Sequence, residues 1–305
     1  MNSKPLLMLL TVAVATASAL FFHPMEEAVA ENQTAGTAKD YAENASTDNQ
    51  RLMELPARLK GVPEQIIRHT GFTLSFNREH NNPNWVAWEL TASEASAAGR
   101  REDNFLPDPE VAAPHQVTTT DYKGSGYDRG HMVPAADMHW SGRAQAECFY
   151  MTNICPQDHS LNAGSWATLE KACRRWAQQE GRVYIVCGPL YDRGRKLPTI
   201  GRDHRVTVPT GFFKCVLSLQ QGKEKAIGFI YSNRSHKQPM TQAAMSVDEV
   251  ERLTGMDFFV NVPDQLERRI EASYSLKVWR EKDCPVWSFQ KNHPYSPSVI
   301  PKHHE

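Results

Sequence analysis

The alternation of apolar and polar positions predicts a sheet-rich fold from about residue 66 onward. Segments 72–76 (FTLSF) and 85–91 (WVAWELT) alternate and are rich in aromatic and β-branched residues, as is typical of strands that bury one face. An Asn81-Asn82-Pro83 turn separates these two segments. Further strands are expected at 148–153, 183–187, 212–219 and 225–231. Together these segments predict a mixed or antiparallel central sheet.

Three segments carry helical signals. The longest runs from near Asn162 to about residue 179 and is followed by a glycine stop signal. A second covers 246–255 and opens with Ser246 and Glu249 in the spacing of a capping box. A third covers 263–272. Helices that follow strands in this order predict an α+β domain.

The first thirty residues have the pattern of a secretory signal. Lys4 precedes an uncharged apolar run at 6–22, and small-residue sites follow at 17–19 and 28–30. The run lies at the lower edge of the length that spans a bilayer, so an uncleaved N-terminal anchor is the alternative. We expect an exported protein, periplasmic or secreted, with no other contact with a membrane.

The remaining chain divides into three regions. Residues 31–65 are expected to form a flexible polar linker, and residues 66–290 the folded domain. Residues 291–305 contain prolines and no hydrophobic period, which predicts a C-terminal tail. The sequence therefore divides at residues 30 and 65 into regions that differ in composition as well as in expected structure.

The charge balance does not by itself indicate a nucleic-acid-binding protein. The 305 residues contain 34 basic and 35 acidic side chains, whereas such proteins usually have a basic face. Removal of residues 1–30 takes away one basic and two acidic side chains, which leaves the mature chain neutral. Basic runs at 174–176, 193–196 and 202–205 could supply a local basic face or could be solvated surface charge.

Six cysteines follow the signal region. An even number in an exported chain permits disulfides, and scattered buried thiols are the alternative. None of the six forms a CxxC pair, which argues against a zinc ribbon or a thioredoxin site. They are Cys148, Cys155, Cys173, Cys187, Cys215 and Cys284.

Two motifs carry candidate chemistry. The first, YDRGHMVPAAD at 127–137, places His131 directly after an arginine and a glycine. The second, MTNICPQDHSLNAGSWATLE at 151–170, supplies two asparagines and a glutamate. A histidine that accepts a proton, amides that bind a hard metal and an arginine for an anion are the groups of a metal-assisted phosphodiesterase.

The spacing of Asn162 and Glu170 limits how both can act on one metal ion. Eight residues of a regular helix span about 12 Å. In a regular helix, one of the two would coordinate directly and the other would act through water. Mg²⁺ keeps several of its waters, so one amide is sufficient ligation by the protein. The absence of paired histidines or carboxylates in a metal-binding pattern argues against a zinc peptidase.

The motifs resemble those of the DNA/RNA non-specific endonucleases, the ββα-metal (His-Me finger) family that includes the secreted nuclease of Serratia and mitochondrial endonuclease G. Beside the DRGH motif, Asn153 lies in T-N-x-x-P-Q, Asn162 in L-N-x-x-x-W and Glu170 in W-x-x-L-E. The resemblance covers about residues 70–275. It implies a central, mostly antiparallel sheet flanked by helices.

The resemblance implies a role for each motif residue. His131 is expected to be the general base, Asn162 the direct ligand of Mg²⁺, and Glu170 the residue that holds water on the metal. Mn²⁺ is an expected substitute for Mg²⁺. Asn153 is expected to support the histidine and the phosphate pocket, and Arg129 to shape the electrostatics or brace the site.

An upstream arginine is also expected, since the family stabilises developing charge with one. Arg100 fits that position better than the adjacent Arg101.

Each motif residue also has a structural explanation. Asn162 could cap a helix, Glu170 could pair with Arg174, and Arg129 could pair with Asp128 or with Asp137. Asn153 could be a hydrogen-bonded turn amide, and a histidine after glycine could simply end a strand.

The resemblance predicts an Mg²⁺-dependent endonuclease that cuts DNA and RNA to 5′-phosphate and 3′-hydroxyl ends. The alternative is a nucleic-acid-binding module with an inactive nuclease fold, for which near-neutral charge is the support. A mitochondrial nuclease of the same chemistry is disfavoured, because transit peptides are arginine-rich and lack such an apolar run. Homodimers are common in the family, and the residues do not identify an inhibitor protein.

Overall fold

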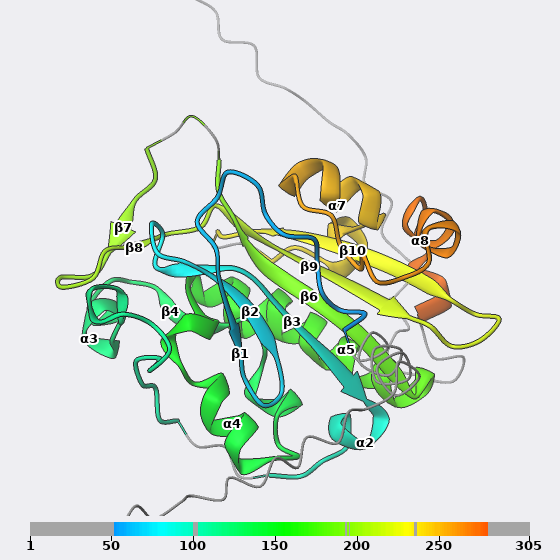
Figure 1. Cartoon of the computed structure of the whole chain (residues 1–305), viewed down its shortest axis with the longest axis horizontal. Coiled ribbons are helices and arrows are strands. Elements are labelled where there is room, and N and C mark those ends of the chain that lie inside the picture. The colour runs from blue at the N-terminus through cyan, green and yellow to red at the C-terminus, as the bar shows by residue number, and fades with distance from the viewer. Residues whose placement is uncertain (1–51, 100–102, 193, 195, 235–236, 280–305) are drawn as a thin grey trace, which may run out of the picture. The chain divides into compact units, whose positions relative to one another are not determined.

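The computed structural model describes residues 52–99, 103–192, 194, 196–234 and 237–279. A seven-stranded sheet forms its centre (Figure 1). Every pair of neighbouring strands in this sheet is antiparallel, which confirms the predicted α+β class. In spatial order the strands are β1 (Gln65–Arg68), β2 (Thr73–Asn77), β3 (Asn82–Thr91), β6 (Arg182–Leu190), β9 (Gly211–Ser218), β10 (Lys225–Ser232) and β11 (Ala244–Met245).

Two small strand pairs and a set of helices surround the sheet. The pairs are β4 (Asp128–His131) with β5 (Ile154–Gln157), and β7 (Thr199–Ile200) with β8 (Val206–Thr207). The helices are α2 (Ala92–Ala95), α3 (Thr119–Tyr122), α4 (Gly142–Cys148), α5 (Ala167–Glu180), α6 (Met240–Ala243), α7 (Val247–Thr254) and α8 (Asp264–Glu271). None of the helices in the described part of the chain is long and apolar enough to cross a membrane.

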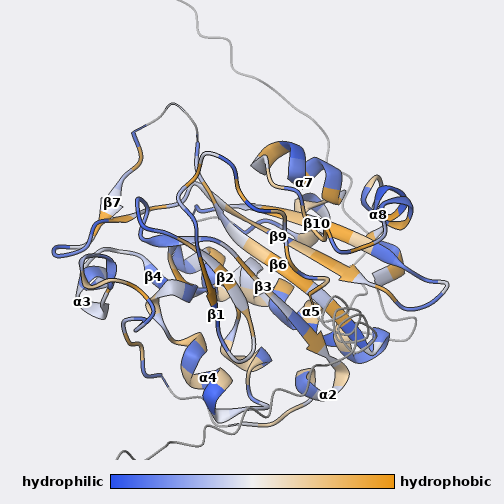
Figure 2. Ribbon diagram, in the orientation of Figure 1, coloured by the Kyte–Doolittle hydropathy of each residue, from blue (hydrophilic) through white to orange (hydrophobic). Residues whose placement is uncertain are grey.

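The two faces of the sheet bury two separate apolar cores. Successive strand residues point to opposite faces, so Val86 and Trp88 of β3 belong to one core and Trp85 and Ala87 to the other. Helix α5 covers the first core, and α7 and α8 cover the second. Figure 2 shows the central strands as hydrophobic and the two outer helices as largely hydrophilic. The two faces therefore carry different layers of the protein.

Most of the predicted strands are confirmed, and one is wrong. β2, β3, β6, β9 and β10 lie where the alternation predicted them. The segment 148–153 is instead the end of α4 followed by a 3₁₀ turn, Met151–Asn153, and the strand begins only at Ile154. Its residues are nearly all buried, and a short buried apolar run does not distinguish a strand from a helix end.

The predicted helices are confirmed, with one irregularity. Ser246 accepts a hydrogen bond from the backbone N–H of Glu249 and so caps α7, which ends at the left-handed Gly255 (φ 74°). The long helix extends to Glu180 as expected, but its first part, Leu161–Trp166, is π-helical. Such turns often occur at functional sites.

The packed fold begins earlier than the expected linker boundary at residue 65. Met53, Leu55 and Leu59 pack against the core beneath α7 and α8. The linker expectation was based on the polar character of the region, and these apolar side chains at its end are sufficient to attach the chain to the fold. The region before residue 52 lies outside the described residues.

The cysteines of the described ranges are all buried. They are Cys148, Cys155, Cys173, Cys187 and Cys215. Of the two alternatives, the structure supports free buried thiols for Cys155, Cys173, Cys187 and Cys215. Cys284 lies outside the described residues.

The β4–β5 pair requires a glycine at its centre. Gly130 pairs with Cys155, and a Cβ atom at Gly130 would collide with the side-chain amide of Gln157 and lie 2.6 Å from its Cβ. Gln157 is fully buried and has no room to move away. The glycine of the DRGH motif therefore permits the two strands to approach.

We expect Gly130→Ala to lower the free energy of unfolding by about 1–3 kcal/mol, because overpacking forces backbone shifts in a closed core. Thermal or denaturant unfolding of the purified protein measures this. Gly142→Ala is the matched control, because a Cβ atom there meets nothing within 4 Å. Equal stability of the two variants would contradict the packing argument.

Candidate active site

A cavity of about 360 Å³ lies between the β4 strand and the N-terminal part of the long helix. It brings together four residues that the sequence motifs predict as site residues, which are His131, Arg129, Asn162 and Glu170. They come from segments up to 41 residues apart, and the fold gathers them in one place. His139 and Arg174, which the sequence did not suggest as site residues, also line the cavity.

His131 ends β4, and aromatic rings hold its imidazole on two sides. The ring centroids of Phe105 and Phe149 lie 5.4 Å and 4.9 Å from that of His131. Trp166 donates a hydrogen bond from its indole N–H to the backbone carbonyl of His131 (3.2 Å). These contacts restrict the orientation of a side chain that faces the cavity.

Asn153 fixes the chain that follows His131. Its amide nitrogen donates to the carbonyls of Val133 (2.9 Å) and Cys148 (2.8 Å), and its amide oxygen accepts from the N–H of Val133 (2.9 Å). Its backbone carbonyl accepts from the N–H of Met132. Asn153 has no exposed surface. Its amide therefore holds the backbone that follows the histidine and does not line the cavity.

Asp128 orients Asn162. The amide nitrogen of Asn162 donates to Asp128 Oδ2 at 2.9 Å, and the imidazole of His159 lies 2.9 Å from the same oxygen. The amide oxygen of Asn162 is thereby turned to the side opposite Asp128. Asn162 is not a helix cap, because its own N–H already donates to the carbonyl of Asp158.

The π-helical segment changes the geometry expected for Asn162 and Glu170. A regular helix between Asn162 and Glu170 would make it difficult for both to be direct ligands of one ion. The wider turn at Leu161–Trp166 breaks that regularity, and both side chains line the same cavity. The assumption of a regular helix was therefore wrong at this point.

Arg129 lies over an aromatic ring. Its guanidinium carbon is 4.2 Å from the centroid of Phe105, within the range of a cation–π contact. The ion pair with Asp128 or Asp137 does not form: Asp128 contacts His159 and Asn162, and Asp137 pairs with Arg174 (2.7 Å). Arg129 is exposed. It lines both the cavity and a second, larger hollow beside it.

Arg174 connects the cavity to a buried carboxylate. Burial opposes its charged form, but the carboxylate of Asp137 outweighs this and raises the pKa of Arg174, and the charge of Glu170 acts in the same direction. The ion-pair partner of Arg174 is Asp137 in the interior. The helical spacing had suggested Glu170 as the partner instead.

A buried lysine lies behind the same wall. Lys214 of β9 is 1% exposed, and its ammonium lies 4.8 Å from the ring centroid of Trp88 and 4.5 Å from that of Trp166. Burial raises the pKa of Asp137, while Arg174 and Lys214 oppose that rise. The wall therefore contains two cations that favour the carboxylate form of Asp137. The isolated lysine in the apolar run FFKCVL was the available signal in the sequence.

A second hollow, of about 660 Å³, adjoins the cavity. Arg129 and Asn162 line both, so the two hollows lie side by side, and the second is called the groove from here on. The second part has aromatic and polar walls with one lysine. Its other lining residues are Asp103, Phe105, Thr119, Tyr122, Lys123, Tyr127 and Asp128.

Asp121 holds one rim of this groove in place. It lies in α3 beside Tyr122, and it accepts hydrogen bonds from the backbone N–H groups of Asp203 and His204 and from that of Thr118. Burial alone would raise its pKa, but these hydrogen bonds and the His204 imidazole outweigh burial and lower the pKa to about 2. The carboxylate therefore ties α3 to the 201–204 turn.

Arg100 and Arg101 lie outside the described residues. The prediction that one of them contacts the phosphate stays a prediction.

Comparison with known proteins identifies the family. The family model for the DNA/RNA non-specific endonucleases matches residues 56–265. The chain belongs to this family. It is 36% identical over 219 residues to "Nuclease 1, mitochondrial" of Schizosaccharomyces pombe, which covers 66% of this chain and 68% of that protein. It is 36% identical over 212 residues to "Nuclease" of Nostoc sp., covering 66% of this chain and 75% of that protein.

A solved structure shares the fold. The structure titled "Crystal structure of the EndoG/EndoGI complex: Mechanism of EndoG inhibition" matches with a TM-score of 0.64 and 28% identity, over 72% of this chain and 94% of that chain. The resemblance drawn from the motifs and the predicted ββα-metal fold are confirmed. The chain is a hydrolase of the endonuclease type.

We expect Asp121→Asn to destabilise the protein by about 2 kcal/mol at neutral pH, since hydrogen bonds to a charged group contribute 1.5–3 kcal/mol. Because the folded-state pKa of Asp121 is lowered from 3.8 to about 2, its stabilisation is complete above pH about 4 and is lost as the pH falls through about 2. Denaturant unfolding of both proteins at pH 7, 4 and 2.5 measures this. A difference that stays constant over this range would contradict it.

Proposed function

We propose that this endonuclease is Mg²⁺-dependent and hydrolyses the phosphodiester bonds of both DNA and RNA, leaving 5′-phosphate and 3′-hydroxyl ends. The observation that carries the proposal is the meeting of His131, Asn162 and Glu170 in one cavity beside the groove. A base, an amide oxygen and a carboxylate at the same opening are the groups that such a reaction needs.

The residues of the cavity suit a hard divalent ion. Asn162 offers an amide oxygen whose direction Asp128 fixes, and Glu170 adds a carboxylate on the same wall. Oxygen ligands of this kind match Mg²⁺, with Mn²⁺ as a substitute. Asn162 would hold the ion directly, and Glu170 would position the water around it. When bound, the ion neutralises charge on the phosphate and on the leaving oxygen.

The protein groups supply the proton transfer and the orientation. His131 takes a proton from the attacking water, and the rings of Phe105 and Phe149 keep its imidazole directed toward the substrate. Asn153 keeps the segment after the histidine in place. Arg129, at the junction of the cavity and the groove, adds positive charge where the phosphate would lie.

The groove favours nucleic acid without a choice of sugar or base. Phe105 and Tyr127 offer aromatic surface, and Lys123 and Arg129 offer positive charge along it. Stacking and backbone contacts of this kind tolerate any sequence. DNA and RNA would therefore both bind.

Three further expectations belong to this proposal. The signal pattern of residues 1–30 supports export to the periplasm or the medium, and an uncleaved anchor is the alternative. A homodimer is the proposed assembly. The solved relative is described as an inhibited complex, so we propose that a protein inhibitor could cover the groove of this chain as well.

We expect His131→Ala to lower the rate of plasmid cleavage by about 10²–10⁴-fold, the usual contribution of a general base. The assay compares DNA and RNA cleavage in Mg²⁺ and in EDTA and identifies the end groups. His115→Ala, a histidine that contacts Asn81 away from the cavity, is the matched control. Full activity of His131→Ala would contradict the assignment of the base, and inactive wild type would favour the binding module.

We expect Asp128→Ala to raise the Mg²⁺ concentration that gives half-maximal cleavage by about 10-fold or more, because residues that orient metal ligands usually contribute 10–100-fold. Saturating metal should restore part of the rate. His159→Ala removes the other group that contacts the same oxygen, and its metal dependence should change less. A metal dependence in Asp128→Ala equal to that of wild type would show that Asp128 does not act through Asn162.

A further inference from the structure

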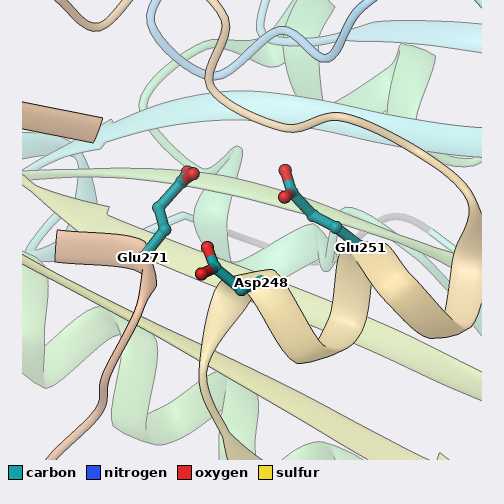
Figure 3. A group of neighbouring side chains, drawn as sticks. All are labelled: Asp248, Glu251 and Glu271. Carbon is teal, nitrogen blue, oxygen red and sulfur yellow. The ribbon is translucent and has the colours of Figure 1, made fainter. Parts of the chain in front are cut away.

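A second group of oxygen ligands lies on the face of the sheet that α7 and α8 cover. The carboxylates of Asp248 and Glu251 on α7 and of Glu271 at the end of α8 each place one oxygen within 4.8 Å of the others. Figure 3 shows the three side chains directed toward a common centre. This core face is distinct from the one beneath α5, which carries the nuclease cavity.

Glu271 is the unusual member of the group. The residue is only 4% exposed, and its Oε1 is buried and has no hydrogen-bond partner among the described residues. Its carboxylate lies beside the gap that it shares with Asp248 and Glu251 (Figure 3). A buried carboxylate oxygen without a donor is costly, so a group in the gap between the three side chains would relieve it.

In the described ion pairs of α7 and α8, no arginine or lysine side chain pairs with these three carboxylates. Arg252 of α7 pairs with Glu249, and Arg269 of α8 pairs with Glu224. Burial, and then the charge of Glu251 and other nearby acids, raises the pKa of Glu271 to about 9. Burial also raises the pKa of Glu251 to about 7, although the backbone N–H of Phe258 donates to it. At neutral pH Glu271 therefore holds a proton in the absence of a cation, and a cation bound between the three carboxylates would displace that proton.

We propose that Asp248, Glu251 and Glu271 bind a Ca²⁺ ion that joins α8 to α7. Calcium–oxygen distances of 2.3–2.6 Å put ligands on opposite sides of the ion about 4.6–5.2 Å apart. The spread of up to 4.8 Å in the cluster fits this range. Mg²⁺, with distances near 2.0–2.1 Å, would need all three oxygens within about 4.2 Å. The cluster therefore suits the larger ion, with water completing the shell.

The ion would stabilise the outer layer of the fold. Helix α7 packs closely on β10, where a Cβ atom at Gly228 would collide with Val250. Helix α8 has only Ile270 and Glu271 fully buried. An ion held by residues of both helices would therefore add a connection where α8 has few apolar contacts. Because the cluster is remote from the cavity, Ca²⁺ here acts on stability and not on cleavage.

Calorimetric titration with Ca²⁺ and thermal unfolding test the site, both in saturating Mg²⁺ so that the catalytic site is occupied. Wild type is expected to bind one Ca²⁺ and to gain about 5 °C in Tm. Glu271→Gln keeps the shape of the side chain and removes its charge. We expect it to lose the Ca²⁺-dependent rise and to have a higher Tm than wild type in calcium-free buffer.

Two more variants make the result decisive. Glu249→Gln, on the same helix but outside the cluster, should behave as wild type. Asp248→Asn alters an exposed residue, so it should fold normally and bind Ca²⁺ at least about 10-fold more weakly. Equal responses of wild type and Glu271→Gln, or no Ca²⁺ binding by wild type, would overturn the proposal. Nuclease activity in Mg²⁺ should be the same in all of these proteins.

Discussion

The close approach of β4 and β5 at Gly130 is the constraint on which the site depends. The pair is only four residues long, and its register joins Asp128 to Gln157 at one end and His131 to Ile154 at the other. A side chain at the glycine would separate the strands at the buried amide of Gln157. His131, the proposed base, and Asp128, which orients the proposed metal ligand, thus occupy the two ends of one element.

Each end of this element is fixed by a different part of the chain. At the histidine end, the buried amide of Asn153 holds the segment that leaves the strand. At the aspartate end, Asp128 reaches the helix that begins just after β5 and sets the direction of Asn162. Since sites built on regular elements hold their geometry better than sites on loops, a short strand pair between two such contacts is a suitable support for proton transfer.

The wall behind the cavity is a balanced set of buried charges. Asp137 is fully buried and has Arg174 as its ion-pair partner, and Lys214 lies between the faces of Trp88 and Trp166. Removing one member would leave the others buried without compensation, which is more costly than the pair itself is stabilising. The charges therefore depend on each other. Because Arg174 also lines the cavity, its ion pair with Asp137 fixes part of the cavity wall.

Local pattern was sufficient for segments with a clear signal of their own and insufficient for a short buried run. The aromatic and β-branched residues of 85–91 predicted β3, which is buried on both faces, and a serine followed three residues later by a glutamate predicted the start of α7. The run at 148–153 is short and buried, and such a run does not distinguish a strand from a helix end, so its assignment to a strand was wrong. The π-helical turn at Leu161–Trp166 was not predicted, because the sequence signals used here identify a helix and its ends but not the width of its turns. Asp128 was visible in the motif, but its role becomes evident only when β5 brings Asn162 to it.

The near-neutral net charge is a weak argument against a nucleic-acid enzyme, because it averages over regions of the protein that lie apart. Lys123, Arg129 and Arg174 line the groove and cavity together with Asp103, Asp128 and Glu170, and a further group of acids lies on the other face of the sheet. Screening limits each charge to about 8–10 Å at ordinary salt, so a phosphate in the groove would experience the side chains that line it and little of the acids on the other face. For this fold, the charges that line the groove decide compatibility with nucleic acid, and the sum over the chain does not.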